Sequence, residues 1–161
     1  LGDVDFAMHE VEGGVRAGVA LADFEVSLRG AMRYDLFITG AVDNPGLLPR
    51  ESLLGVTAGG RVDWYRFYPE VVITLHADAL VQGDREQTQG LEDGMETDLA
   101  GAWGGLYSSY RVAGQFDIFG AFLYGWTRSN WSGASARNPD VMKSRRSDST
   151  QTIQFGLAHR F

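Results

Sequence analysis

The feature that most constrains this chain is a two-residue alternation of apolar and polar side chains, which recurs along most of its length. The longest stretch runs from Phe24 to Val42, where every second residue is apolar or glycine and the residues between them carry the charge. No long window keeps the spacing of an amphipathic helix. Because successive side chains of a β-strand point to opposite faces of a sheet, the pattern predicts an all-β fold whose strands have one apolar and one polar face.

We predict eight strands in a single domain that covers residues 1–161. The first is expected near 3–11, followed by a tight turn at Glu12 to Gly14 and a second strand that ends at Leu21. A β-bulge in place of one turn is the alternative, which would leave seven strands and require strand pairing from elsewhere. The other strands are expected at 24–42, 54–64, 71–82, 95–112, 116–127 and 151–161.

The glycine-rich strand at 95–112 has an ambiguous facing. Trp103 and Tyr107 fall on one of its faces, whereas Leu106 and Tyr110 fall on the other. Both faces therefore carry large apolar groups, and the facing of this strand stays open.

The connections between the predicted strands fall into two groups. Short turns are expected at 22–23, 66–69 and 113–115, and longer polar loops at 43–51, 83–94 and 130–147. Successive connections of an up-and-down sheet alternate between its two ends, so the short turns share one end and the long loops share the other. This asymmetry is typical of transmembrane β-barrels.

The composition argues against several other classes of protein. No apolar run approaches the roughly 18 residues that a membrane helix needs, which leaves a closed barrel as the structure that could pair all its backbone groups in lipid. The chain has no cysteine, so disulfides and thiolate metal sites are excluded. A net charge of -7, with Lys143 as the single lysine, argues against nucleic acid as a partner. No signal peptide is recognisable, and we therefore expect the mature form of an exported protein.

The last predicted strand carries the most specific pattern. Phe155, Leu157 and Phe161 share one face of this strand, small or polar residues occupy the other, and the segment ends on an aromatic residue. This resembles the carboxyl-terminal strand of the small eight-stranded bacterial outer-membrane β-barrels, such as the transmembrane domain of outer membrane protein A and its short relatives. His159 departs mildly from that pattern, because the family usually has tyrosine or another apolar residue two positions before the end.

The resemblance implies an all-β, eight-stranded antiparallel up-and-down transmembrane β-barrel with short periplasmic turns and longer external loops. It also implies a place in the Gram-negative outer membrane, among its lipids and lipopolysaccharide. Phe155, Leu157 and Phe161 would then be the signal by which the barrel-insertion machinery recognises the chain.

The polar face predicts a network inside such a barrel. An eight-stranded barrel has an interior about wide enough to be filled by side chains, and charges placed there must pair because their desolvation is costly. The expected members of this lumenal network are Arg33, Asp35, Arg61, Asp63, His76, Asp78 and Asp117. We expect them to plug the barrel; the alternative is a narrow small-solute or ion channel, gated by rearrangement of these pairs.

A basic group in the predicted loop 130–147 suggests a contact with lipopolysaccharide. Lys143, Arg145 and Arg146 would lie at the level of the lipid phosphates, and the planar donors of arginine suit phosphate. Ordinary loop charge is the alternative. The acidic residues of 84–98 do not have the spacing of a calcium loop, and no cofactor or metal site is predicted.

An enzyme that modifies lipid A is a second class of function. It would need a hydroxyl nucleophile, a histidine base and a carboxylate within reach of one another. His76 and Asp78 share a strand face, but no His-x-Ser pair or similar motif accompanies them. We therefore predict a non-enzymatic protein with a structural or interaction role, with a protein partner in an envelope assembly as a further expectation.

A soluble, lipocalin-like binding barrel is the alternative outside the membrane, because it has the same alternation with the apolar side chains inward. Aromatic residues at the strand ends argue against it, since they match the belts found at membrane interfaces. Trp64 and Phe116 mark one end, and Trp126 and Trp131 mark the other.

Overall fold

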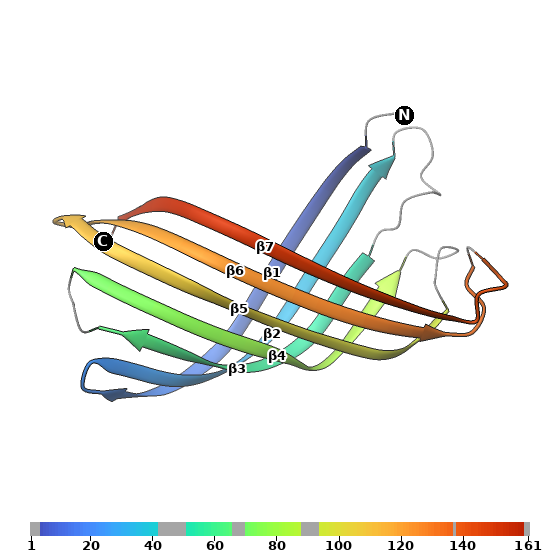
Figure 1. The fold of residues 1–161 in the computed structure, drawn as a ribbon, viewed down its shortest axis with the longest axis horizontal. Helices are drawn as coiled ribbons and strands as arrows, with labels where there is room; N and C mark the ends of the chain where they lie inside the picture. The colour runs from blue at the N-terminus through green and yellow to red at the C-terminus, as the bar shows by residue number, and fades with distance from the viewer. Residues whose placement is uncertain (1–3, 42–50, 66–69, 88–93, 137, 160–161) are drawn as a thin grey trace.

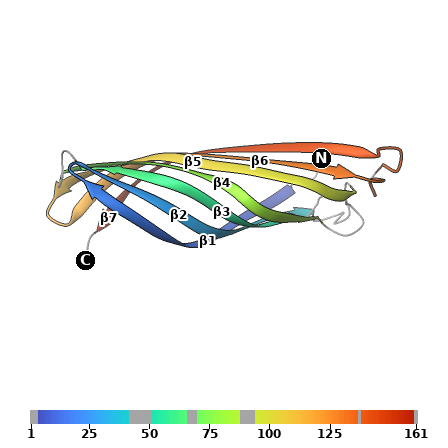
Figure 2. The same cartoon turned by 90° about the horizontal axis from the view of Figure 1, so that it is seen from below.

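A computed structural model describes residues 4–41, 51–65, 70–87, 94–136 and 138–159. These residues form one antiparallel sheet of seven strands in the order β1 to β7, which confirms the all-β, up-and-down arrangement. The strands are β1 (Val4–Leu21), β2 (Phe24–Ala41), β3 (Glu51–Trp64), β4 (Val71–Gln87), β5 (Met95–Ala113), β6 (Phe116–Ser132) and β7 (Lys143–His159). Figures 1 and 2 show a long, strongly twisted and curled sheet. No helix in the described part of the chain is long and apolar enough to cross a membrane.

The prediction of two strands before residue 22 is wrong, because β1 runs unbroken from Val4 to Leu21. The pairing of β1 with β2 has no register shift, so a bulge does not replace the predicted turn either. The turn at Glu12 to Gly14 is predicted where the apolar phase changes between Met8 and Val15. A Cβ on Gly14 would lie 2.4 Å from the backbone oxygen of Gly30, so this glycine allows two strands to approach closely. The described residues therefore form seven strands in place of the expected eight.

The described sheet is not closed into a barrel. β1 and β7 are its two edges, and no pairing between them is present among the described residues.

Several strands extend into segments that were predicted as loops. β6 continues to Ser132 and β7 begins at Lys143, so both ends of the predicted loop 130–147 are strand. β4 similarly continues to Gln87, and β3 already begins at Glu51. The predicted turn 66–69 and most of the loop 43–51 lie outside the described residues.

Both short turns that fall within the described residues are confirmed. β1 and β2 are joined by Ala22 and Asp23, and β5 and β6 by Gly114 and Gln115. The first residue of each turn has a positive φ, 47° for Ala22 and 54° for Gly114. The second residues, Asp23 and Gln115, do not have a positive φ. A two-residue hairpin loop with a positive φ at its first position alone is a type II′ turn, whose twist suits the two strands that it joins.

The two faces of the sheet differ in polarity, and the apolar face is the exposed one, which is the reverse of a soluble protein. Large apolar side chains on one face are exposed, for example Phe155 at 82%, Val15 at 80% and Leu28 at 74%. We call this the apolar face. The buried side chains are mainly polar and lie on the other, polar face, where Asp63 and Ser129 are both 0% exposed.

The sheet curls toward its polar face. Side chains from strands that are not neighbours meet there, as when Arg146 of β7 forms an ion pair with Glu51 of β3. Such a contact requires the intervening strands to bend around it, as the curved sheet in Figure 2 shows.

The ambiguous strand β5 places Trp103 and Tyr107 on the polar face, where Tyr107 stacks on Phe119 of β6 with ring centroids 5.6 Å apart. Leu106 and Tyr110 are exposed on the apolar face. The expectation that Trp131 belongs to an aromatic belt is wrong, because its side chain is only 3% exposed and lies on the polar face.

Candidate functional site

The curled polar face surrounds an open-sided cavity of about 490 Å³. Every strand contributes to its wall, so the cavity belongs to the sheet as a whole. The polar-face residues around it include Glu10, Glu12, Arg29, Arg33, Asp35, Glu51, His76, Asp78, Arg85, Trp103, Thr127, Arg146, Asp148, Thr150 and Thr152. Most ionic groups of this face form three clusters along the strands, and Arg111 and Asp117 form a separate pair.

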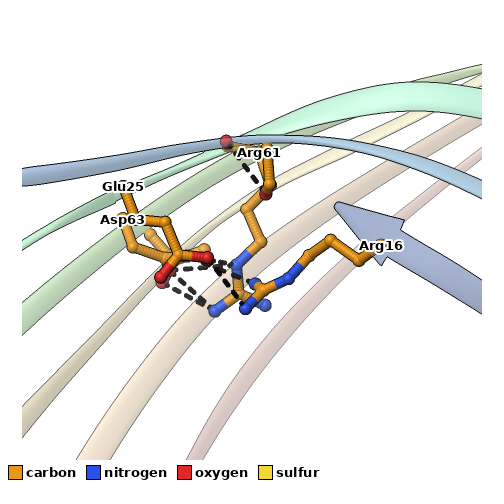
Figure 3. A network of polar contacts seen from close by, with 6 residues as sticks. Arg16, Glu25, Arg61 and Asp63 are labelled. Carbon is orange, nitrogen blue, oxygen red and sulfur yellow. Dashed lines mark hydrogen bonds and ion pairs between the residues drawn. The ribbon is translucent and has the colours of Figure 1, made fainter. Parts of the chain in front are cut away.

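The first cluster surrounds Asp63 (Figure 3). It lies near the end of the sheet that carries the short turns, since Asp63 pairs with Glu25 close to the turn at Ala22. The Nε of Arg61 lies 2.9 Å from both carboxylate oxygens of Asp63, and its Nη2 lies 2.7 Å from Oδ1. Thr74 of β4 donates its hydroxyl to the same carboxylate. Arg16 of β1 bridges Asp63 at 3.4 Å and Glu25 at 3.1 Å. We name these five residues the Asp63 cluster; it ties β1, β2, β3 and β4 together.

The second cluster lies in the middle of the polar face and centres on two arginines of β2. Arg29 pairs with Asp78 of β4 at 3.0 Å and with Glu12 of β1. Glu12 also lies 3.8 Å from Arg33, which links the two arginines. His76 places its Nδ1 3.3 Å from Asp78.

Arg33 completes this second cluster, which we name the Arg33 cluster. It is only 7% exposed and pairs with Glu10 at 2.8 Å and with Asp35 at 2.9 Å. Its guanidinium lies over the ring of Trp103, 4.5 Å from the centroid. A desolvated cation above an indole face is a favourable arrangement, so Trp103 supports Arg33 where water is scarce.

Glycines of β5 and β6 make room for Trp103. A Cβ on Gly101 would lie 2.7 Å from the indole, and one on Gly125 would lie 2.9 Å from it. A Cβ on Gly105 would similarly meet His76 at 2.8 Å. The glycine-rich composition of β5 therefore allows large rings to lie flat inside the curled sheet.

The third cluster lies toward the opposite end of the strands. Arg146 of β7 pairs with Glu51 and, at 2.9 Å, with Asp148. Arg85 of β4 pairs with Asp148 at 3.2 Å and donates to the hydroxyl of Thr127 at 2.9 Å. We name this the Arg146 cluster; it connects β3, β4, β6 and β7 across the cavity.

The predicted network residues all lie on the polar face, but they do not form one site. Arg33, Asp35, His76 and Asp78 belong to the Arg33 cluster, and Arg61 and Asp63 to the Asp63 cluster. Asp117 is buried at 4% exposure and pairs with Arg111 of β5 at 3.7 Å, beside the turn at Gly114.

The predicted basic group does not lie together on one surface. Lys143 and Arg145 are exposed, and Arg145 donates to the side chain of Asn130 at 3.1 Å. Arg146 instead points to the polar face, where it belongs to the third cluster. The reason is that these residues form the start of β7, in which neighbouring side chains point to opposite faces.

The predicted insertion signal can be placed in part. Phe155 and Leu157 are exposed on the apolar face, at 82% and 74%. Phe161 lies outside the described residues.

Sequence reasoning missed about half of the ionic groups in these clusters. Glu10, Glu12 and Arg16 were obscured by the predicted turn in β1. Asp148 lies between the predicted loop 130–147 and the predicted strand 151–161, although a recurring pattern marks it. The sequence Arg-x-Asp occurs at 33–35, 61–63 and 146–148, and in each case the arginine Nε lies 2.9 Å from the aspartate two residues on.

This motif has a simple physical basis, because residues two apart on a strand share a face and their side chains can meet. His76 and Asp78 follow the same spacing.

The carboxylates of the three clusters are held mainly by arginine side chains. Among the described residues, no group of three or more histidine, cysteine, aspartate or glutamate side chains is arranged to hold a metal ion. Asp78, the carboxylate beside His76, is already engaged by Arg29. Comparison with known proteins gives no further assignment: no protein-family model, curated protein or solved structure matches this chain.

Proposed function

We propose that this chain is the membrane-spanning sheet of a bacterial outer-membrane β-barrel, with a structural or interaction role and no enzymatic activity. The observation that carries the proposal is the inversion of its two faces. Apolar side chains are exposed along the outside of the sheet, whereas arginine and aspartate side chains are buried within its curl. Hydrocarbon is the solvent that stabilises such an arrangement, because it favours the exposed apolar face and isolates the paired charges.

The lengths of the strands support this proposal. The described strands have between 14 and 19 residues, more than the roughly 9 to 11 that cross a membrane. The apolar face is most continuous in the half of the strands next to the short turns at Ala22 and Gly114. We place that end in the periplasm, so that the strands project outward on the other side.

Aromatic pairs on the apolar side support this placement. Phe24 stacks on Trp64 with centroids 6.1 Å apart, and Phe116 contacts the ring of His159 at 4.9 Å. All four residues lie at the end of the sheet with the short turns. Such rings are typical of a membrane interface, and His159 can occupy this position because it is amphipathic.

The proposed role is that of a barrel whose interior is filled by the three ionic clusters. A closed barrel is required, since an open sheet edge is not stable in hydrocarbon. We propose closure as an eight-stranded barrel, the even strand number expected of a single-chain outer-membrane barrel. Insertion machinery would recognise Phe155, Leu157 and Phe161, and the exposed Lys143 and Arg145 would contact lipopolysaccharide.

A narrow channel is the second candidate, and the cavity of about 490 Å³ favours it. The Asp63 cluster would then be the constriction, because Asp63 is 0% exposed. Recordings in planar bilayers distinguish the two roles: a filled barrel gives no discrete conductance steps, whereas a channel gives steps that change in D63N.

Membrane facing can be tested directly because the chain has no native cysteine. Single cysteines at Ile153 and Thr152 would carry spin labels on neighbouring residues of β7, the first 67% exposed on the apolar face and the second beside the cavity. In lipid vesicles we expect the label at 153 to be relaxed more by oxygen than by a water-soluble nickel chelate. The label at 152 is the matched control and should not show this lipid signature.

Two outcomes would contradict the membrane proposal. One is a chelate-accessible label at 153 in a chain that folds without detergent, as a soluble barrel would. The other is the absence of heat-modifiable gel migration after folding into detergent. An enzymatic role would instead appear as a change in the mass spectrum of lipid A in cells that produce the chain.

A further inference from the structure

The two edges of the described sheet run in the same direction. Each strand is antiparallel to the next in the order β1 to β7, so β1 and β7 are parallel to each other. Direct pairing of these edges would make one parallel junction in an otherwise antiparallel sheet. A second copy inserted in the same orientation would meet the same difficulty, because its β1 would also run parallel to β7. One strand placed between β1 and β7 and antiparallel to both would avoid a parallel junction.

Both edges face the same cavity. Glu10 and Glu12 of β1 line it from one side, and Asp148 and Thr152 of β7 line it from the other. The open side of the cavity therefore lies between the two edges that lack a partner in the described sheet. A strand inserted there would close the cavity and satisfy the edge backbone groups together.

The charge of the polar face indicates what this strand carries. The carboxylates of Glu10, Glu12, Glu25, Asp35, Glu51, Asp63, Asp78, Asp117 and Asp148 outnumber the guanidinium groups of Arg16, Arg29, Arg33, Arg61, Arg85, Arg111 and Arg146. Two carboxylates beside the edges, Glu10 and Asp148, are ion-paired but keep 49% and 38% of their side-chain surface exposed. Enclosing them without added positive charge would be costly.

We propose that the partner of both edges is one β-strand that runs antiparallel to β1 and β7, with apolar side chains toward lipid and basic side chains toward Glu10 and Asp148. This inference rests on the proposed membrane function. It specifies the direction, the facing and the charge of the closing strand.

The test uses designed strand peptides added to the chain during refolding into detergent micelles. Each peptide alternates leucine or valine with polar residues, and the two peptides differ only in having lysine or glutamate at the positions that face Glu10 and Asp148. Hydrogen exchange of the β1 and β7 amides is the readout. We expect the lysine peptide to slow exchange at both edges at least tenfold, and the glutamate peptide to have little effect.

The contribution of the Glu10 carboxylate can be tested in the same experiment. In E10Q, the advantage of the lysine peptide over the glutamate peptide should fall at β1 and persist at β7. Fusing each strand ahead of Leu1 through a short turn repeats the comparison if the free peptides do not associate.

Three results would overturn the inference: equal protection by the two peptides in both formats, edge amides already protected in the monomeric chain alone, or protection that depends on dimer formation. The spin label at position 153 separates this failure from failure of the membrane proposal. A label in lipid without protection by the lysine strand rejects only the closing strand, whereas a label in water rejects the membrane function itself.

Discussion

Replacing Asp63 by asparagine should destabilise the folded sheet by about 2 to 4 kcal/mol. Asp63 is 0% exposed and accepts hydrogen bonds from Arg61 and Arg16, as well as from Thr74. Hydrogen bonds to charged groups contribute about 1.5 to 3 kcal/mol each, and breaking a buried ion pair costs about 3 to 5 kcal/mol. The loss of unfolding free energy should be smaller than the sum of these contributions, because Arg61 and Arg16 are 37% and 40% exposed and can be solvated by water.

Urea unfolding in micelles, followed by tryptophan fluorescence, measures this loss. D98N is the matched control, because Asp98 is 53% exposed and lies 3.6 Å from Arg128. Its loss should be about 0.5 kcal/mol or less, as for other exposed pairs. Equal losses in D63N and D98N, with both variants showing heat-modifiable migration, would refute the view that the Asp63 cluster holds the curl of the sheet.

Three further substitutions test local features of the structure by the same unfolding measurement. G59A should cost about 1 to 3 kcal/mol, because its Cβ would lie 2.2 Å from both the Ala77 backbone oxygen and the Asp78 carboxylate; G60A, whose Cβ has no contact closer than 3.6 Å, should change stability by less than about 0.5 kcal/mol. A22G should stabilise by about 0.5 to 1 kcal/mol, since glycine removes the cost of a φ of 47°, and a loss would contradict the type II′ turn. Burial raises the pKa of Glu96, at the loop end of β5, although a backbone N–H of Arg85 partly opposes this. The ionised form of Glu96 therefore lowers the stability of the folded chain above that raised pKa, so E96Q should be more stable than the native chain at neutral pH. The unfolding midpoints of the two chains should converge as the pH falls through the raised pKa of Glu96. A difference that stays constant with pH would contradict this.

The alternation of the sequence predicted the strands and their facing well, because both follow from a backbone period of two residues. The Phe24 to Val42 pattern corresponds to β2, and its apolar half is the exposed half. Alternation failed where the phase itself changes. Between β3 and β4 the register shifts at Val56 and Thr57, which leaves Val81 unpaired and brings Gln82 opposite Val56. A strand inferred from strict alternation places Gln82 on the polar face, whereas it is exposed beside apolar neighbours.

Glycine is the second reason why sequence and structure differ. A glycine pair is compatible with a tight turn and also with two backbones in close contact, and local sequence does not distinguish them. In the pair at Gly13 and Gly14, it is Gly14 that allows close contact between β1 and β2, since a Cβ on Gly13 would meet nothing within 4 Å. Gly114, in contrast, takes the positive φ of a turn. Assigning the first pair to a turn added one strand and removed three ionic residues from the polar face.

The membership of the ionic clusters depends on curvature, which no local pattern encodes. Alternation places a side chain on the polar face, and the Arg-x-Asp spacing pairs it with a neighbour on its own strand. Which other strands it reaches is decided by how far the sheet curls. Glu51 and Arg146 are separated by 95 residues and meet because β3 and β7 face each other across the cavity. The cross-strand ion pairs therefore depend on the curl that they help to stabilise, and D63N tests that coupling at its most buried group.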